Sequence, residues 1–76
     1  MGIELKLSEV RLGLYAEEKL REAINYREKA KKDNAYFLMY SRTIRAYHLA
    51  YNRLTNPAIK EHLHLMEDEL DRRTSK

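Results

Sequence analysis

The segment from Asn34 to Leu54 repeats large side chains at helical spacing, and this pattern constrains the fold more than any other feature. At about 100° per residue, one arc of the segment holds Tyr36, Tyr40, Thr43, Ile44, Tyr47, Tyr51 and Leu54. Tyrosine rings fill the volume of a core while their hydroxyls find polar partners at its rim. We therefore expect a helix over residues 34–54 that packs through this arc against the rest of the chain.

The same segment carries a second side, which points nearly opposite the tyrosine arc. Leu38, Arg42, Arg45 and Leu49 follow four-three-four spacing, and Arg53 extends this surface toward the end of the segment. In a three-helix bundle both neighbours of a helix lie on one side of it, so the bundle itself cannot cover this surface. Arginine is enriched in the energetically important parts of binding interfaces. We call the surface formed by these five residues the basic face and predict that it binds a partner.

Three occupants of the basic face fit the sequence. The first is the apolar N-terminal part of the same chain, with Ile3, Leu5 and Leu7. The second is the same face of another copy, which would form a homodimer. The third is a different molecule. On this basis we expect a small protein-binding regulator, inhibitor or adaptor that acts on a protein partner, on itself, or on both.

Two short runs break the helical pattern. Residues 31–34 place two lysines at a helix C-terminus, followed by Asp33 and Asn34 as N-cap residues of the next helix. Residues 55–57, Thr-Asn-Pro, supply capping side chains and then proline at the first helical position. The predicted helices cover residues 9–31, 34–54 and 57–72.

The predicted fold is all-α: an antiparallel hairpin of two long helices plus a shorter third helix, in one domain over residues 1–76. The first helix has its apolar stripe at Leu12, Ala16, Leu20, Ala23, Ile24 and Ala30. The third has its stripe at Ile59, Leu63, Met66 and Leu70. We expect an extended tail over 1–7 and a frayed tail over 73–76.

Two structures fit the N-terminal residues. Alternating apolar residues over 3–14 fit a two-stranded hairpin with its turn at Ser8 and the next residue. Alternatively, Ser8 caps the first helix, and Leu7 and Leu12 form a hydrophobic staple. The Ser-Glu dipeptide is a poor hairpin turn, and an isolated hairpin is only marginally stable. We therefore favour a helix from Ser8, with residues 2–7 extended.

Composition excludes several classes of protein. The chain has 76 residues and no cysteine, so it has no disulfide framework and no thiolate metal site. It lacks the apolar run of a signal peptide and any stretch of about 18 apolar residues that could span a membrane. We expect a soluble, cytoplasmic protein with no membrane partner.

The distribution of charge supports an alternative function. The chain has a net charge of +3, yet no acidic residue lies between Asp33 and Glu61. The cations of the middle of the chain are Lys29, Lys31, Lys32, Arg42, Arg45, Arg53 and Lys60. The basic central helix and the lysines at the hairpin tip could follow a phosphate backbone, with tyrosines stacking on bases. Nucleic acid is therefore the alternative partner, through Lys29, Lys31, Lys32, Arg42, Arg45 and Arg53.

Catalytic and metal-binding patterns are weak. His62 and His64 lie two apart on one helix and cannot share a metal ion. Arg42 and His48 form an Arg-x5-His pair, an arrangement also found in HEPN-type ribonucleases, in which His48 would act as general acid or base. The rest of that motif is missing, and the chain is short for that fold. We expect no enzyme activity, no metal and no cofactor, with an HEPN-like ribonuclease as a remote alternative.

Overall fold

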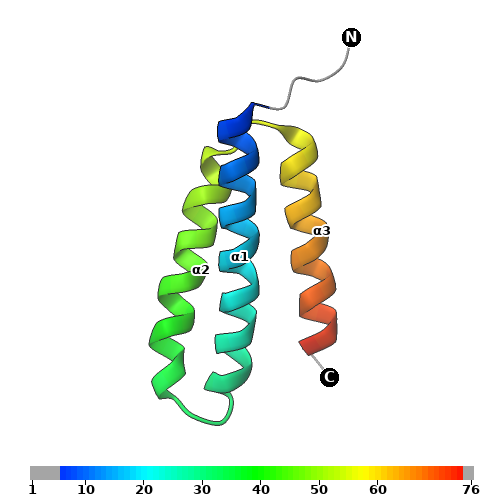
Figure 1. Cartoon of the computed structure of the whole chain (residues 1–76). Coiled ribbons are helices and arrows are strands. Elements are labelled where there is room, and N and C mark those ends of the chain that lie inside the picture. The colour runs from blue at the N-terminus through cyan, green and yellow to red at the C-terminus, as the bar shows by residue number, and fades with distance from the viewer. Residues whose placement is uncertain (1–5, 75–76) are drawn as a thin grey trace.

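The computed structural model describes residues 6–74, which form three helices joined by two short turns (Figure 1). The helices are α1 (Leu7–Ala30), α2 (Ala35–Arg53) and α3 (Pro57–Thr74). No strand occurs within residues 6–74, so the predicted all-α fold is confirmed. Every helix boundary lies within two residues of its predicted position. None of these three helices is long and apolar enough to cross a lipid bilayer.

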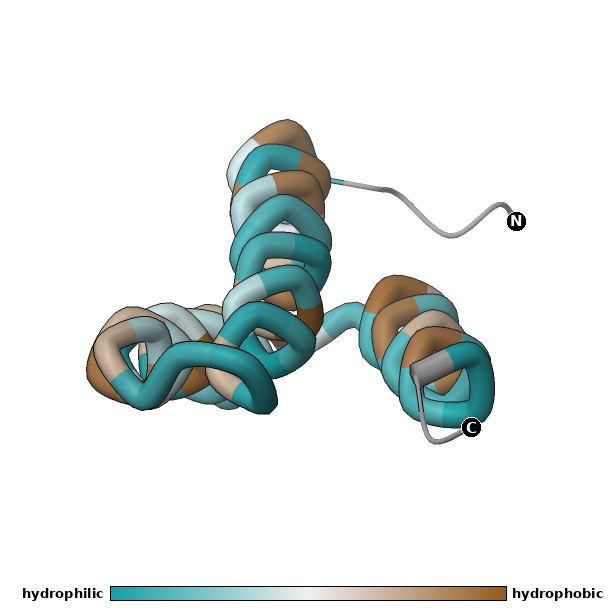
Figure 2. The backbone as a smooth tube through the Cα atoms, turned by 90° about the horizontal axis from the view of Figure 1, so that it is seen from below, coloured by the Kyte–Doolittle hydropathy of each residue, from teal (hydrophilic) through white to brown (hydrophobic). Residues whose placement is uncertain are grey.

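The three pairs of helices differ in how extensively they pack. α1 and α2 pack along their length as the predicted antiparallel hairpin, whereas α3 packs less extensively on α1 and hardly approaches α2. Figure 2 shows the molecule from below, with α1 between α2 and α3. The molecule measures 50 × 23 × 14 Å, so it is broader in one direction across the helices than in the other. The bundle is therefore open, with α2 and α3 on opposite flanks of α1.

The core lies where α1 meets both neighbours. Its buried members are Ala16, Leu20 and Ile24 of α1, Tyr47 and Ala50 of α2, Leu54 of the turn, and Leu63 of α3. Six of these seven residues belong to the three apolar stripes of the sequence, and only Ala50 does not. The tyrosine arc of α2 is therefore confirmed as the inner side of that helix.

Long side chains bridge the space between α2 and α3. The Tyr47 hydroxyl donates a hydrogen bond to Glu67 Oε2 at 3.2 Å, and the Lys60 ammonium lies 5.0 Å from the centre of the Tyr51 ring. Burial raises the pKa of the Tyr47 phenol, and the nearby Glu67 carboxylate raises it further. The tyrosine arc thus contacts both neighbouring helices, although the backbones of α2 and α3 stay apart.

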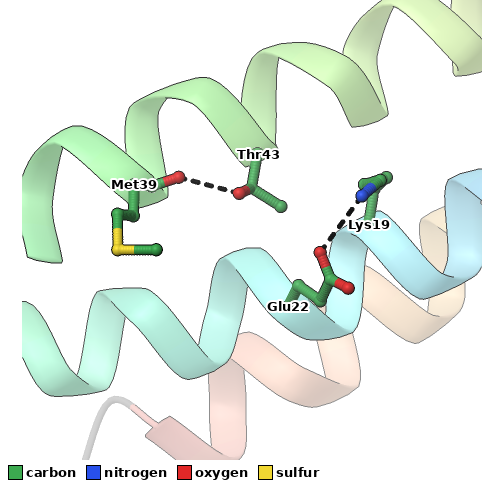
Figure 3. Close-up of polar contacts among 4 residues, drawn as sticks. All are labelled: Lys19, Glu22, Met39 and Thr43. Atoms are coloured by element: carbon green, nitrogen blue, oxygen red, sulfur yellow. Dashed lines mark hydrogen bonds and ion pairs between the residues drawn. The ribbon is translucent and has the colours of Figure 1, made fainter.

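Polar groups also line the rim of the α1–α2 contact (Figure 3). On α2, the Thr43 hydroxyl donates a hydrogen bond to the Met39 carbonyl at 2.7 Å. On α1, the Lys19 ammonium pairs with Glu22 at 3.3 Å. Because Thr43 satisfies its hydroxyl within its own helix, it can lie half-buried against α1 without a partner from that helix.

Side chains of both turns cap the N-terminus of the helix that follows, though not always from the expected residue. The backbone N–H of Ala35 donates to Asp33 Oδ1 at 3.0 Å, whereas Asn34 makes no side-chain cap. Asn56 Oδ1 accepts hydrogen bonds from the N–H groups of Ala58 and Ile59 at 2.9 and 3.2 Å. The prediction that Asn56 caps a helix beginning at Pro57 is therefore confirmed.

A carboxylate of α1 fastens the turn between α2 and α3. Glu9 Oε1 accepts hydrogen bonds from the Thr55 hydroxyl at 2.7 Å, from the Thr55 N–H at 2.7 Å and from the Asn56 N–H at 2.8 Å. These hydrogen bonds, led by that of the Thr55 hydroxyl, lower the pKa of Glu9. One side chain thus ties the start of α1 to the start of α3.

Two predictions about the chain ends need correction, and one alternative is excluded. The β-hairpin over 3–14, the alternative to a helix from Ser8, does not form, because residues 7–14 are helical. Ser8 is not the N-cap: α1 begins at Leu7, the preceding Lys6 is extended, and Leu7 is 64% exposed rather than held in a staple. α3 continues to Thr74, beyond the predicted end at residue 72. The remainder of the predicted extended and frayed tails, 1–5 and 75–76, lies outside the described residues.

Candidate functional site

The basic face lies on the outer side of α2, away from α1. α2 packs inward through Tyr47, Ala50 and Leu54, so residues on the opposite side of the helix point outward. Leu38 is 58% exposed and Leu49 is 60% exposed. The three arginines of the basic face, Arg42, Arg45 and Arg53, are also exposed. The structure therefore places all five predicted residues along one accessible surface.

No described part of the chain covers the two leucines of the basic face. Leu7, which the sequence offered as a cover, begins α1 at the end of the molecule opposite the hairpin tip, near which Leu38 lies (Figure 1). Leu7 is itself largely exposed, so it does not fold over the face. The other two proposed covering residues, Ile3 and Leu5, lie outside the described residues.

The arginines of the basic face are not neutralised within residues 6–74. Elsewhere in this part of the chain, arginines pair with carboxylates, as Arg21 does with Glu17 at 3.1 Å. No carboxylate of the described residues forms such a pair with Arg42, Arg45 or Arg53. The reason is local, because α2 contains no acidic residue at all. The outer side of α2 therefore carries uncompensated positive charge between exposed leucines.

One end of the basic face continues onto α1 through a shallow groove of about 280 Å³. Leu49 and Arg53 line this groove together with Ala46 and Ala50 of α2 and with Leu12 and Tyr15 of α1. Tyr15 is 45% exposed. Sequence analysis missed Tyr15, although its position three residues after Leu12 places it beside the apolar stripe of α1. The surface available to a partner therefore extends across the hairpin.

The other end of the basic face has apolar neighbours that sequence analysis also missed. Phe37 is 61% exposed and Met39 is 43% exposed, next to Leu38. Three consecutive large apolar residues cannot all point inward on one helix. In the sequence, this run was therefore the sign that large apolar side chains are exposed here. It gives the start of α2 an apolar accessible surface next to Leu38.

The residues of the nucleic-acid alternative are spread along the molecule. Lys29 lies 5.4 Å from the centre of the Tyr36 ring, and Lys31 pairs with Glu28 at 3.2 Å. These lysines and Lys32 are at the hairpin tip, while Arg53 is at the far end of α2. The tyrosines of the arc are buried or half-buried against α1 and α3, so their rings are not available as a stacking platform.

The candidate catalytic groups are not brought together. Arg42 and His48 are roughly 120° apart around α2, and both are exposed. His62 lies 3.9 Å from Glu17, and His64 lies 3.8 Å from Asp68 on its own helix. Within residues 6–74 no group of three or more histidine, aspartate or glutamate side chains could hold a metal ion.

A second, more apolar groove of about 330 Å³ separates α1 from α3. It is lined by Val10, Gly13, Leu14, Ala58 and Ile59, with Glu17 and His62 at its edge. The sequence pattern does not predict this groove, because it forms only where Gly13 lets α3 approach α1.

No protein-family model, curated protein or solved structure matches this chain significantly.

Proposed function

We propose that this protein is a small non-enzymatic binding module, a regulator, inhibitor or adaptor, whose basic face docks on an acidic surface of a partner protein. One observation carries the proposal: Leu38 and Leu49 are more than half exposed on either side of Arg42 and Arg45, whose charges no described carboxylate neutralises. An unpaired cationic surface with apolar anchors is typical of a protein interface and unlike an ordinary solvated helix face.

The chemistry of the basic face defines the partner. A guanidinium binds a carboxylate or a phosphate through two parallel hydrogen bonds, so on a protein partner Arg42 and Arg45 fit aspartate or glutamate side chains. Leu38 and Leu49 are eleven residues apart, about 16 Å along the helix, so the partner must offer apolar contacts on both sides of its acidic centre. An acidic amphipathic helix meets both requirements.

Affinity capture from native lysate treated with nuclease tests this proposal. We expect the wild-type chain to retain a partner that the Leu38→Asp/Leu49→Asp variant and the Arg42→Glu/Arg45→Glu variant lose. The retained partner is then purified, and its affinity for each variant is measured by calorimetry. A loss of at least about tenfold is expected when anchors of this kind are removed.

The matched control is Arg11→Glu/Arg21→Glu, which makes the same change of net charge on the exposed side of α1. This variant should bind the partner as the wild type does. Equal loss in the control would mean that net charge, not the basic face, determines binding. Unchanged binding by both basic-face variants would overturn the proposal.

Nucleic-acid binding is a distinct outcome, and one further variant of the basic face tests it. Fluorescence anisotropy with labelled single-stranded RNA and duplex DNA at about 50 mM salt detects such binding directly, since phosphate contacts weaken steeply as salt rises. Tight binding that is lost on Arg42→Ala/Arg45→Ala would replace the protein partner by a nucleic acid. No binding under these conditions removes that alternative.

A further inference from the structure

We infer that one partner of the basic face is α3 of a second copy of this chain, so that copies associate edge to edge. The complementary surface consists of Glu61, Leu65, Asp68 and Glu69 on the outer side of α3, and we call it the acidic face. This inference rests on the proposed function, because it uses the same residues of α2.

The acidic face matches the basic face in kind. Leu65 is 59% exposed, and Glu61 and Asp68 lie on either side of it, four residues before and three residues after. Among residues 6–74, Asp68 pairs with His64 at 3.8 Å and Glu69 with Arg73 at 2.7 Å, both within their own helix. Such exposed pairs contribute little free energy. Arginines of another molecule can therefore replace these partners at small cost.

The two faces cannot meet within one molecule. α2 and α3 lie on opposite flanks of α1 (Figures 1 and 2), and the residues of both faces are exposed on the sides of these helices opposite their core residues. A contact between the basic face and the acidic face must therefore join different molecules. It leaves one unused face at each end of the pair, so it is a head-to-tail contact that continues into a ring or a filament.

The registers of the two helices agree. α2 ends and α3 begins at the same turn, so the two helices run in opposite directions from it. Asp68 is twelve residues beyond Asn56, and Arg42 is twelve residues before Leu54. A second copy placed alongside in the same orientation therefore brings Asp68 level with Arg42. In the same arrangement Leu65 is level with Arg45.

The alternative pairing, basic face against basic face in a two-fold dimer, is electrostatically unfavourable. It would bring Arg42, Arg45 and Arg53 of both copies together with no acidic residue on either helix. Like charges placed against each other in an interface cost free energy. The charge pattern thus selects α3, not α2, as the surface of the second copy.

Sedimentation velocity of the wild-type protein is the first test. At low salt we expect assemblies that grow beyond a dimer as concentration rises, and high salt should reduce them because the charge pairs are exposed. A protein that stays monomeric at millimolar concentration contradicts the inference. A dimer that does not grow also contradicts it, because opposite edges cannot both meet the same neighbour.

Charge reversal tests the residues. The Arg42→Glu/Arg45→Glu variant and the Glu61→Lys/Asp68→Lys variant should each associate at least about tenfold more weakly than the wild type. A mixture of the two variants should assemble again, because every contact then joins opposite charges. An α3 variant that associates like the wild type, or a mixture that stays monomeric, overturns the inference.

Two controls complete the design. Circular dichroism should show that all variants keep the helix content of the wild type, as expected for exposed residues. The Arg11→Glu/Arg21→Glu variant should associate like the wild type. If the chain is monomeric yet needs Arg42 and Arg45 to bind another protein, the inference fails and the proposed function stands. If copies assemble as described but no other protein depends on the basic face, the inference stands and the adaptor proposal fails.

Discussion

Among single residues, Glu9 holds the turn between α2 and α3 against the start of α1. One carboxylate oxygen accepts three hydrogen bonds from Thr55 and Asn56, which hold the turn that begins α3. No sequence pattern predicts this contact, since the partners are 46 and 47 positions away. A glutamate in the first turn of a helix is expected there for its charge alone.

Replacing Glu9 by glutamine should lower stability and weaken its dependence on pH. The pKa of Glu9 is lowered below its ordinary value of 4.5 in the folded state, so its stabilising contribution is complete above that value and is lost as pH falls through the folded pKa. Urea unfolding followed by circular dichroism at several pH values measures this. The wild type should lose more stability on acidification than Glu9→Gln. The matched control is Glu18→Gln, an exposed position on α1, which should behave like the wild type.

Tyr47 combines a buried ring with a hydroxyl that forms a hydrogen bond to another helix. Its side chain is 1% exposed and donates to Glu67. Tyr47→Phe keeps the ring but leaves the carboxylate without this donor, so we expect a loss of about 1 kcal/mol in the free energy of unfolding. Tyr51→Phe is the control, because the Tyr51 hydroxyl makes no hydrogen bond to a described residue. Equal effects of both changes would show that the Tyr47–Glu67 bond adds nothing.

The Tyr47 hydroxyl also makes the stability of the fold depend on pH in the alkaline range. Because the pKa of Tyr47 is raised above its ordinary value of 10.0 in the folded state, its contribution to stability is complete below that pH and is lost as pH rises further. A spectrophotometric titration should therefore show one phenol that ionises only as the protein unfolds in alkali. That phenol should be absent from Tyr47→Phe.

At the scale of the helices, Gly13 decides how closely α3 approaches α1. A Cβ atom at this position would lie 2.8 Å from Ile59 Cγ2, which is a branch close to the backbone and cannot swing away easily. Alanine is worth about 1 kcal/mol more than glycine within a helix, whereas overpacking costs typically about 1–3 kcal/mol. We therefore expect Gly13→Ala to be neutral to destabilising.

A double-mutant cycle checks this explanation. In an Ile59→Ala background the obstructing methyl group is gone, so Gly13→Ala should become stabilising through helix propensity alone. Chemical denaturation of the four proteins gives the coupling free energy. A Gly13→Ala change that stabilises both backgrounds equally would mean that the helices separate without cost at this point.

Across the fold as a whole, the open arrangement separates the two outer surfaces proposed for function. α1 lies between α2 and α3, so the basic face and the acidic face lie on opposite flanks of the molecule. The proposed edge-to-edge assembly depends on this separation, because a contact between the two faces then joins different molecules.

The helices and their inner sides could be predicted from the amino-acid sequence alone. The two breaks at 31–34 and 55–57, the tyrosine arc and the four-three-four stripe of α3 were all readable, because helical periodicity and capping depend on neighbours within a few residues. The outward position of Arg42 and Arg45 followed from the same periodicity. Local rules failed at three helix ends: Ser8 does not cap α1, which begins at Leu7, Asn34 makes no side-chain cap for α2, and α3 continues to Thr74.

Only the tertiary structure decided how the helices are arranged. Apolar stripes show that helices pack, but they do not tell which pairs pack closely, because that depends on how side chains interlock in three dimensions. The contact between Gly13 and Ile59, the Glu9 clamp and the wide separation of α2 from α3 all join residues far apart in sequence. The complementarity of the acidic face of α3 to the basic face of α2 was likewise not predictable from the sequence, because it depends on where both faces lie in space.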